Sequence, residues 1–294
     1  LHDNWTDNFS TTFKATYRDY RNGQNPPGGQ NFADVTVCTA PTSDATLTSC
    51  AAGFSSVRFG PDQFRHANSL DEQEVRLQAL GEYSFSNHRI KFGVQARKAE
   101  VFDVFVPQSH GLYYFDSLAD FAAGRAGSLT YQNAISGNPI DAAFDSVYWT
   151  YSAYVQDTAD ITDNLRASVG VRFETYNQPD RPTLNPNFKA RNGYDNTKTI
   201  DGEVLVMPRL SVEWKPDPMI KISGGGGLFA GGTPDVLTGT PFYNNGFETS
   251  SITVQRTATG FVETTGAGGF TQAIGSAALD SLNTSAANFG VRPA

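Results

Sequence analysis

The stretch of sequence that decides the fold is WTYSAYVQDTADITDNLRASVGVRFE, at residues 149–174. Apolar side chains occupy most odd positions before the short polar turn at residues 162–164, and polar or amphipathic side chains occupy the even ones. After the turn, the same alternation continues from Leu165 to Glu174. A period of two over this length is typical of β-strands and not of helices. The stretch therefore predicts an antiparallel hairpin with a tight turn.

The same alternation surrounds three other short polar segments, at residues 86–88, residues 215–218 and, at the start of the chain, residues 6–8. The first two have an alternating run on both sides, and the third has one after it. Together with the hairpin at 149–174, these runs predict seven strands.

Long connections separate the hairpins, at about residues 20–73, 101–146, 177–203 and from 231 onward. Compact soluble domains seldom contain such long loops, whereas outer-membrane barrels have short periplasmic turns and long extracellular loops. Strands of roughly 11 or 12 residues, tilted near 45°, would span about 25 to 28 Å, close to the thickness of a hydrocarbon core. We therefore predict an all-β fold, a portion of an antiparallel transmembrane β-barrel in the cell outer membrane.

Charge separates the two faces of the predicted strands, because a charged side chain facing lipid costs roughly 2 to 4 kcal/mol at the midplane. Every Lys, Arg and Glu of these strands lies opposite the apolar face, and Asp157 is the exception, either at the periplasmic rim or beside a bulge. We expect the inward basic residues to pair with carboxylates of a plug domain, with guidance of anionic solutes as the alternative. These basic residues are Lys14, Arg18, Arg76, Lys91, Arg97, Arg172 and Arg209.

Composition and motifs argue against several function classes. The 22 Lys and Arg against 30 Asp and Glu give a formal charge of −8, which disfavours nucleic acid as a partner. No run of 18 apolar residues is present, so no transmembrane helix is predicted. The four histidines occur without an HExxH motif or an acidic ligand cluster, and Gly-x-Ser-x-Gly is absent. We therefore predict no catalytic residue, no metal site and no cofactor, and hence no enzyme.

The two cysteines, Cys38 and Cys50, flank a stretch rich in Thr, Ser, Ala and Pro. In an oxidising compartment they would close one extracellular loop and stabilise it by roughly 3 kcal/mol. The alternative is a pair of free thiols in a cytosolic loop. We predict the disulfide.

The connection at residues 101–146 combines aromatic rings with carboxylates, a pairing that suits sugars, peptides or cationic chelates. The alternative is that these rings pack the loop against its neighbours or a plug. The candidate substrate-binding residues are Tyr113, Tyr114, Phe115, Asp116 and Asp120.

The hairpin also carries a family resemblance. The runs Ala153–Asp157 (AYVQD), Thr162–Leu165 (TDNL) and Gly170–Glu174 (GVRFE) resemble a barrel hairpin of TonB-dependent outer-membrane receptors. Pro208–Trp214 and Gly232–Asp235 are similar to the Oar-like branch of that family. The resemblance covers residues 148 to about 256. It implies a many-stranded barrel, occluded by an N-terminal plug, that imports scarce large solutes with energy from an inner-membrane TonB complex.

The sequence differs from this family pattern because it contains neither a plug domain nor a TonB box. It begins at Leu1 and shows no signal peptide, so we expect residues 1–294 to be part of the barrel domain of a longer or processed protein. The expected partners are outer-membrane lipid, an unknown extracellular ligand, and the plug and TonB complex through the missing N-terminal region. The predicted function is uptake of a chelated metal, an oligosaccharide or a peptide. The alternative is a non-transporting outer-membrane barrel or a secreted β-rich binding or adhesion protein.

Overall fold

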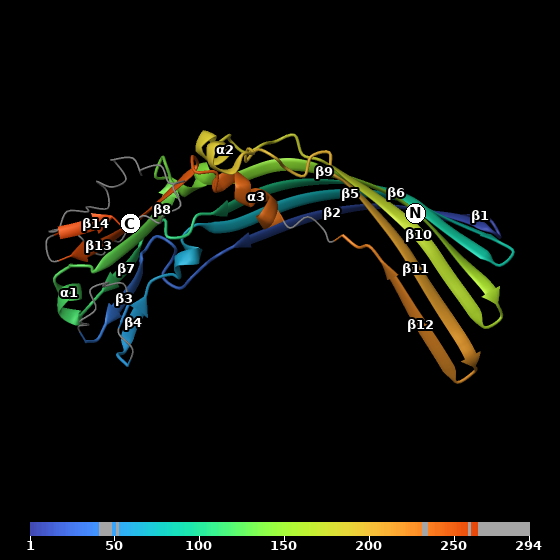
Figure 1. Ribbon diagram of the computed structural model, residues 1–294, viewed down its shortest axis with the longest axis horizontal. Helices are drawn as coiled ribbons and strands as arrows, with labels where there is room; N and C mark the ends of the chain where they lie inside the picture. Colours follow the sequence, from blue (N-terminus) through green and yellow to red (C-terminus); the bar gives the residue numbers. More distant parts are fainter. Residues whose placement is uncertain (41–48, 51–52, 231–234, 258–259, 264–294) are drawn as a thin grey trace.

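The computed structural model describes residues 1–40, 49–50, 53–230, 235–257 and 260–263. Two β-sheets make up this part of the chain (Figure 1). The C-terminal stretch from residue 264, rich in Ala, Gly, Ser and Thr, lies outside the described residues.

The larger sheet, here called the long sheet, has eight strands, and every neighbouring pair is antiparallel. In spatial order they are β1 (His2–Thr6), β2 (Phe9–Gly23), β5 (Asn68–Phe85), β6 (His88–Phe105), β9 (Phe144–Thr162), β10 (Leu165–Asn177), β11 (Val204–Asp217) and β12 (Ile220–Gly227).

The predicted hairpins are confirmed. Tight turns join β5 to β6, β9 to β10 and β11 to β12, and the hairpins are also neighbours of one another. Because all these neighbours are antiparallel, the three turns lie at the same end of the sheet, as Figure 1 shows. For this sheet the prediction of seven strands was one short, because residues 2–6 form an eighth strand that pairs with β2. The six strands of the other sheet were not predicted.

The long sheet extends further into the connections than predicted. The strands β2, β5, β6 and β9 reach Gly23, Asn68, Phe105 and Phe144, respectively. Backbone pairing continues there, since Gly23 still pairs with Ser69 and Asn68 with Phe105. The strict alternation used for the prediction weakens in these extensions, where side chains on the polar face become buried.

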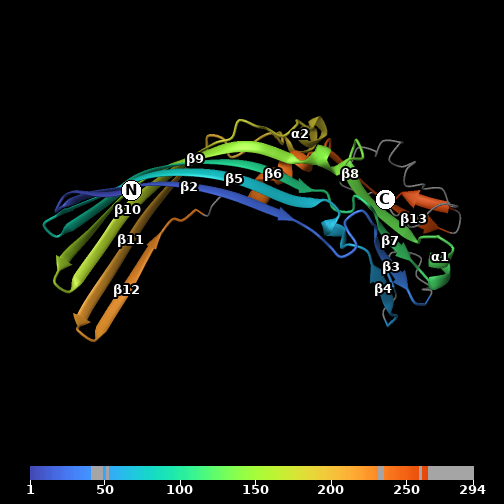
Figure 2. The ribbon, with the colours of Figure 1, turned by 180° about the vertical axis from the view of Figure 1, so that it is seen from behind.

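A second sheet, here called the short sheet, is formed from segments that the sequence analysis treated as loops. Its order is β14 (Gly260–Glu263), β13 (Thr249–Thr257), β8 (Ser128–Ala134), β7 (Leu112–Phe115), β3 (Asp34–Cys38) and β4 (Ser56–Phe59). Only β3 and β7 are parallel among these neighbours. The short sheet lies beyond the end of the long sheet that is opposite the hairpin turns (Figures 1 and 2).

Three short α-helices complete the described fold: α1 (Leu118–Ala122), α2 (Pro186–Asn192) and α3 (Asp235–Tyr243). Of these, α3 packs against β9, where the ring centroids of Phe144 and Phe242 are 4.7 Å apart and Gly239 lies directly against Phe144. Tyr243 is buried in the same apolar cluster as Tyr148. Within the described residues, none of the helices is long and apolar enough to cross a membrane.

Candidate functional site

Two of the candidate substrate-binding residues lie in the core of the short sheet. Tyr113 and Phe115 point to one face of β7 and are 1% and 0% exposed. They pack in one apolar cluster with Val35 of β3 and Leu129 of β8. Side chains buried this completely have no surface to offer a solute, which favours the packing role over direct binding at these two positions.

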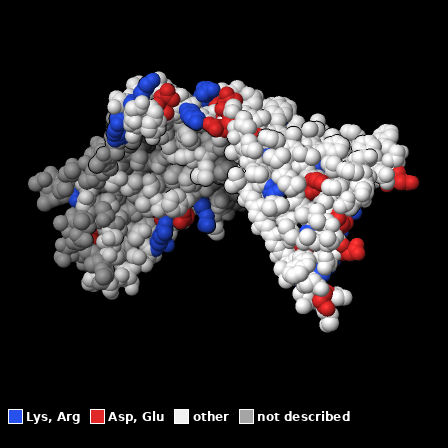
Figure 3. Space-filling model, turned by 45° about the vertical axis from the view of Figure 1, so that its right-hand side comes forward, with Lys and Arg blue, Asp and Glu red and all other residues white. Residues whose placement is uncertain are grey.

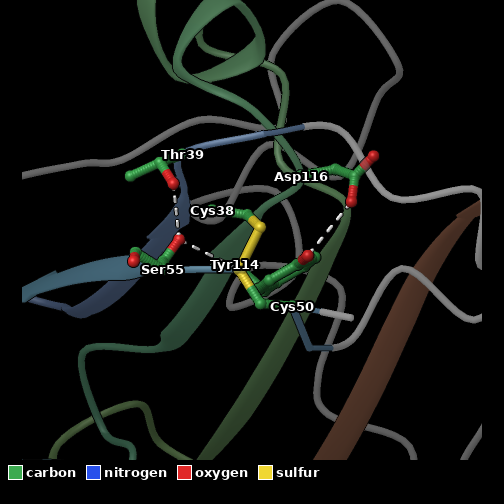
Figure 4. Close-up of a disulfide and its surroundings, with 6 residues drawn as sticks. All are labelled: Cys38, Thr39, Cys50, Ser55, Tyr114 and Asp116. Atoms are coloured by element: carbon green, nitrogen blue, oxygen red, sulfur yellow. Dashed lines mark hydrogen bonds between the residues drawn. A yellow bond between two sulfur atoms is a disulfide. The ribbon is translucent and has the colours of Figure 1, made fainter. Parts of the chain in front are cut away.

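Tyr114 alternates with these two residues in β7, and Asp116 is the first residue after the strand. The Tyr114 hydroxyl donates a hydrogen bond of 3.0 Å to Oδ1 of Asp116, beside the disulfide (Figure 4). Both residues are also buried, at 4% and 6% exposure. The structure thus brings these two candidates together as a hydrogen-bonded pair.

Asp120 lies one turn into α1 and is bound by two arginines. Arg256 reaches both carboxylate oxygens at 3.2 and 3.1 Å, and Arg125 reaches Oδ1 at 2.8 Å. Ser117 caps the helix and also donates to this carboxylate. The hydrogen bond from Arg256 lowers the pKa of Asp120, although partial burial acts in the opposite direction. The carboxylate is therefore held ionised by partners within the short sheet.

The predicted disulfide is confirmed. Cys38 and Cys50 are bonded, with a Cα separation of 5.5 Å. Thr39 and Ser55 hold the two ends of the loop together, because the Thr39 hydroxyl donates to the Ser55 carbonyl at 2.8 Å (Figure 4). The bond therefore joins the end of β3 to the segment that leads into β4.

The two faces of the long sheet differ as predicted. Large apolar side chains on one face, here called the apolar face, are exposed, including Val94 at 58%, Val169 at 59% and Leu210 at 56%. Soluble monomers rarely expose apolar areas that extend over so many strands. The apolar face therefore requires an apolar environment such as lipid.

Asp157 is the charged exception on this face within the predicted strands, and the structure gives it a partner. The outer extensions of the strands carry further charged side chains on the same face, such as the pairs Lys98–Glu100 and Arg21–Asp19. Nδ1 of His88 lies 2.7 Å from Oδ2 of Asp157, and the His88 ring stacks on Phe85 with centroids 5.1 Å apart. Asp157 keeps the regular register opposite Val169, so a bulge at that position is not the explanation. His88 is the first residue of β6 and lies next to the turn. Its contact with Asp157 therefore places Asp157 near the rim of the barrel.

The opposite face, here called the polar face, contains a pocket of about 580 Å³ near the outer ends of the strands, away from the turns. One row of paired residues crosses five strands there and runs through Thr16, Arg76, Arg97, Thr150 and Tyr176. Glutamates from β5 and β10 also line the pocket, together with Arg18 and Gln95. The pocket is therefore built by cross-strand register and not by any one loop.

Arg97 is the central cation of this pocket. It binds Glu72 at 3.0 Å and also Glu74, and its guanidinium lies 5.3 Å from the centre of the Tyr148 ring. Both glutamate side chains are 5% exposed. Arg18, on the neighbouring strand β2, forms a second ion pair with Glu72 at 2.5 Å. Buried carboxylates with this many partners form a rigid, charge-paired wall.

Most of the predicted inward basic residues thus have counter-charges within the sheet itself. Besides the pairs above, Arg76 lies 2.8 Å from Glu74, and Arg172 lies 3.1 Å from Glu174. Lys91 likewise pairs with Glu82. In the view of Figure 3, basic and acidic groups lie close together, with no broad area of one sign. These pairs do not depend on a plug domain, and they weaken the case for steering of anionic solutes.

Two glutamates of this pocket, Glu72 and Glu74, were not predicted as lining residues. Glu72 and Glu74 share the face of Arg76 by the same two-residue period, so their side of the sheet could have been predicted. Their partners could not, because Arg97 and Arg18 come from neighbouring strands whose register is set in three dimensions. No group of three or more potential metal ligands occurs in the described part of the chain.

Comparison with known proteins gives one family match and one structural likeness. The chain is similar to the ferric-catecholate import receptor Fiu of E. coli K12 in its open form, with 13% identity and a TM-score of 0.37. The likeness covers 87% of this chain and 34% of that receptor chain, so this chain spans about a third of the receptor's length. No curated protein matches the sequence.

The family match is the outer membrane beta barrel domain, over residues 3–293. This match covers nearly the whole chain, and it agrees with the antiparallel long sheet, its one-sided turns and its exposed apolar face. The chain therefore belongs to the outer membrane beta barrel domain family, and its long sheet is a portion of a transmembrane β-barrel in the outer membrane.

Proposed function

We propose that this chain forms part of the barrel of a TonB-dependent receptor that takes up a scarce solute across the outer membrane. The observation that carries the proposal is the charge-paired pocket on the polar face, at the end of the sheet away from the tight turns. In an outer-membrane barrel this face lines the lumen, and the end away from the short turns opens to the exterior. A hydrated, rigid wall at that position suits passage of a polar solute.

The hairpin resemblance at residues 153–174 supports the same proposal, since it points to receptors of this kind. The solute classes in view are a chelated metal, an oligosaccharide or a peptide. Because five of the inward basic residues are already paired, the wall presents little net charge to the solute, and hydrogen bonding is the expected mode of contact.

Within this function, the short sheet is the surface that an external solute meets first. Tyr113 and Phe115 serve as its core, and Arg256 and Arg125 hold Asp120 in place. The pair of Tyr114 and Asp116 beside the disulfide remains the candidate contact, which a solute would reach after local opening of that face.

Energy coupling is tested by the binding of the purified full-length protein to the periplasmic domain of TonB, measured by isothermal titration calorimetry. We expect saturable binding that is lost when the TonB box of the full-length protein is deleted. Failure of the full-length protein to bind would favour a non-transporting outer-membrane barrel.

The test of the pocket is uptake by cells that produce the full-length protein, given a radiolabelled ferric catecholate, a maltooligosaccharide and an oligopeptide in parallel. We expect TonB-dependent accumulation of one class, reduced by Arg97→Gln and unaffected by Arg166→Gln. Arg166 is the matched control because its pair with Asp160 is exposed and lies next to the turn. Equal accumulation of the solute in cells with and without TonB would contradict the proposal.

A further inference from the structure

Two connecting segments hold the short sheet against the long sheet. Residues 60–67 lead from β4 into β5, and residues 106–111 lead from β6 into β7. The segments run side by side, since the backbone N–H of Gln108 donates to the Gln63 carbonyl at 2.9 Å and the two side chains are also hydrogen-bonded. These two segments, here called the junction, therefore help to fix the position of the short sheet relative to the long sheet.

A pair of histidines lies inside the junction. His66 is 3% exposed, and its ring meets that of His110 edge to face, with centroids 5.5 Å apart. The backbone N–H of His110 donates to Nδ1 of His66 at 3.2 Å. That nitrogen must therefore carry no proton, and His66 is neutral with its proton on Nε2. The His66 ring also interacts with the backbone of Pro61, a contact that favours the protonated ring.

Protonation of His66 is incompatible with this arrangement. A proton on Nδ1 would face the N–H of His110, so the hydrogen bond between the two segments would be lost. The new charge would also be buried beside His110. The facing carboxylates are Asp34 of β3, which is bound to Arg58, and Asp62, which caps the turn before His66. They favour the proton, but burial and His110 outweigh them and lower the pKa of His66 to about 4.

We propose that the junction is an acid-sensitive latch: neutral His66 fastens the short sheet to the long sheet, and acidification releases it while the barrel hairpins stay paired. The two strands next to the latch, β5 and β6, belong to the membrane barrel and keep their backbone pairing when His66 is charged. Release therefore changes the position of the short sheet over the outer ends of the strands. Release of the latch requires neither the solute nor TonB.

The experiment is hydrogen–deuterium exchange of the full-length protein in detergent micelles at pH 7.5 and pH 5.0, read as protection factors corrected for intrinsic exchange. Peptides covering residues 106–116 report on the latch, and peptides covering 165–177 report on the barrel. An open state in which His66 regains its ordinary pKa predicts a loss of protection of roughly 25-fold at the latch between these pH values. The barrel peptides should not change.

His66→Asn is the decisive variant, because its amide oxygen offers an acceptor near the position of Nδ1 and does not titrate. We expect it to reduce the acid response to the part contributed by His110, whose pKa is also lowered by burial, whereas His88→Asn on the apolar face should retain the full response. If His66→Asn does not fold, exchange of the ring C2 hydrogen in the unmodified protein gives the midpoint for His66. A midpoint near 6.5, an unchanged acid response in His66→Asn, or equal loss of protection in the barrel peptides would overturn the latch.

Discussion

Strand β12 contains a matched pair of glycines that tests how closely it approaches β11. A Cβ added at Gly225 would lie 2.6 Å from the carbonyl oxygen of Leu210 and 2.9 Å from Cβ of Ser211. At Gly226 no atom lies within 4 Å of the added Cβ. Neither glycine has a positive φ, so the two sites differ in available space and not in backbone strain. Gly226 shares the apolar face with its register partner Leu210, and Gly225 shares the polar face with Ser211, so the comparison reports the close approach together with any difference between the two faces.

The expected magnitudes follow from this difference in space. Replacing glycine by alanine where there is room stabilises a protein by about 0.4 to 1 kcal/mol, because the unfolded chain loses freedom. Gly226→Ala should therefore raise the free energy of unfolding. At Gly225 the obstacle is backbone, which cannot rotate away, and overpacking of this kind costs about 1 to 3 kcal/mol. Gly225→Ala should thus be less stable than Gly226→Ala by roughly 2 kcal/mol.

The assay is equilibrium unfolding in guanidinium chloride of the full-length protein refolded in detergent micelles. Heat-modifiable gel mobility gives the folded fraction of each variant before the titration. Equal stability of the two variants, or greater stability of Gly225→Ala, would refute the close approach of β11 and β12.

Further predictions concern the two faces of the barrel and the charge pairs, all measured in the same unfolding assay. Val171→Arg should block assembly or lower the free energy of unfolding by roughly 2 to 4 kcal/mol, because this position faces lipid. Arg172→Gln on the polar face should have a much smaller effect. Equal tolerance of both substitutions would mean that neither face contacts lipid. Arg97→Gln should lower the free energy of unfolding by about 3 kcal/mol, because it leaves buried carboxylates without a cationic partner. Arg166→Gln, at an exposed pair, should lower it by less than about 1 kcal/mol. Similar losses in the two variants would contradict the buried network. Asp120→Asn should lower the stability of the short sheet at pH 7, because the pKa of Asp120 is lowered and its ionised form stabilises the fold. This effect should disappear as the pH falls through that lowered pKa, and a loss that persists in stronger acid would refute the charge-based role.

The hairpins, their faces and the disulfide were all accessible from the sequence alone. A two-residue period and a short polar turn are properties of contiguous residues, so WTYSAYVQDTADITDNLRASVGVRFE was enough to predict β9, β10 and the turn between them. Sorting by charge then separated the lipid-facing side from the polar side, because a charge that faces lipid is costly near the midplane of every strand. Cys38 and Cys50 are close in sequence, and only their redox compartment had to be inferred.

The short sheet and the pairing within the pocket were decided only by tertiary structure. The strands β3 and β7 are short and lie 73 residues or more apart in the chain, so neither carries a periodicity long enough to identify it, and their parallel pairing leaves no turn as a signal. The same limit explains why the burial of the candidate residue Tyr113 in the core of the short sheet could not be predicted. For Arg97 the period fixes the face, but the choice of Glu72 and Glu74 as partners depends on the register between strands. Register is a relation between distant segments, and it exists only once the chain has folded.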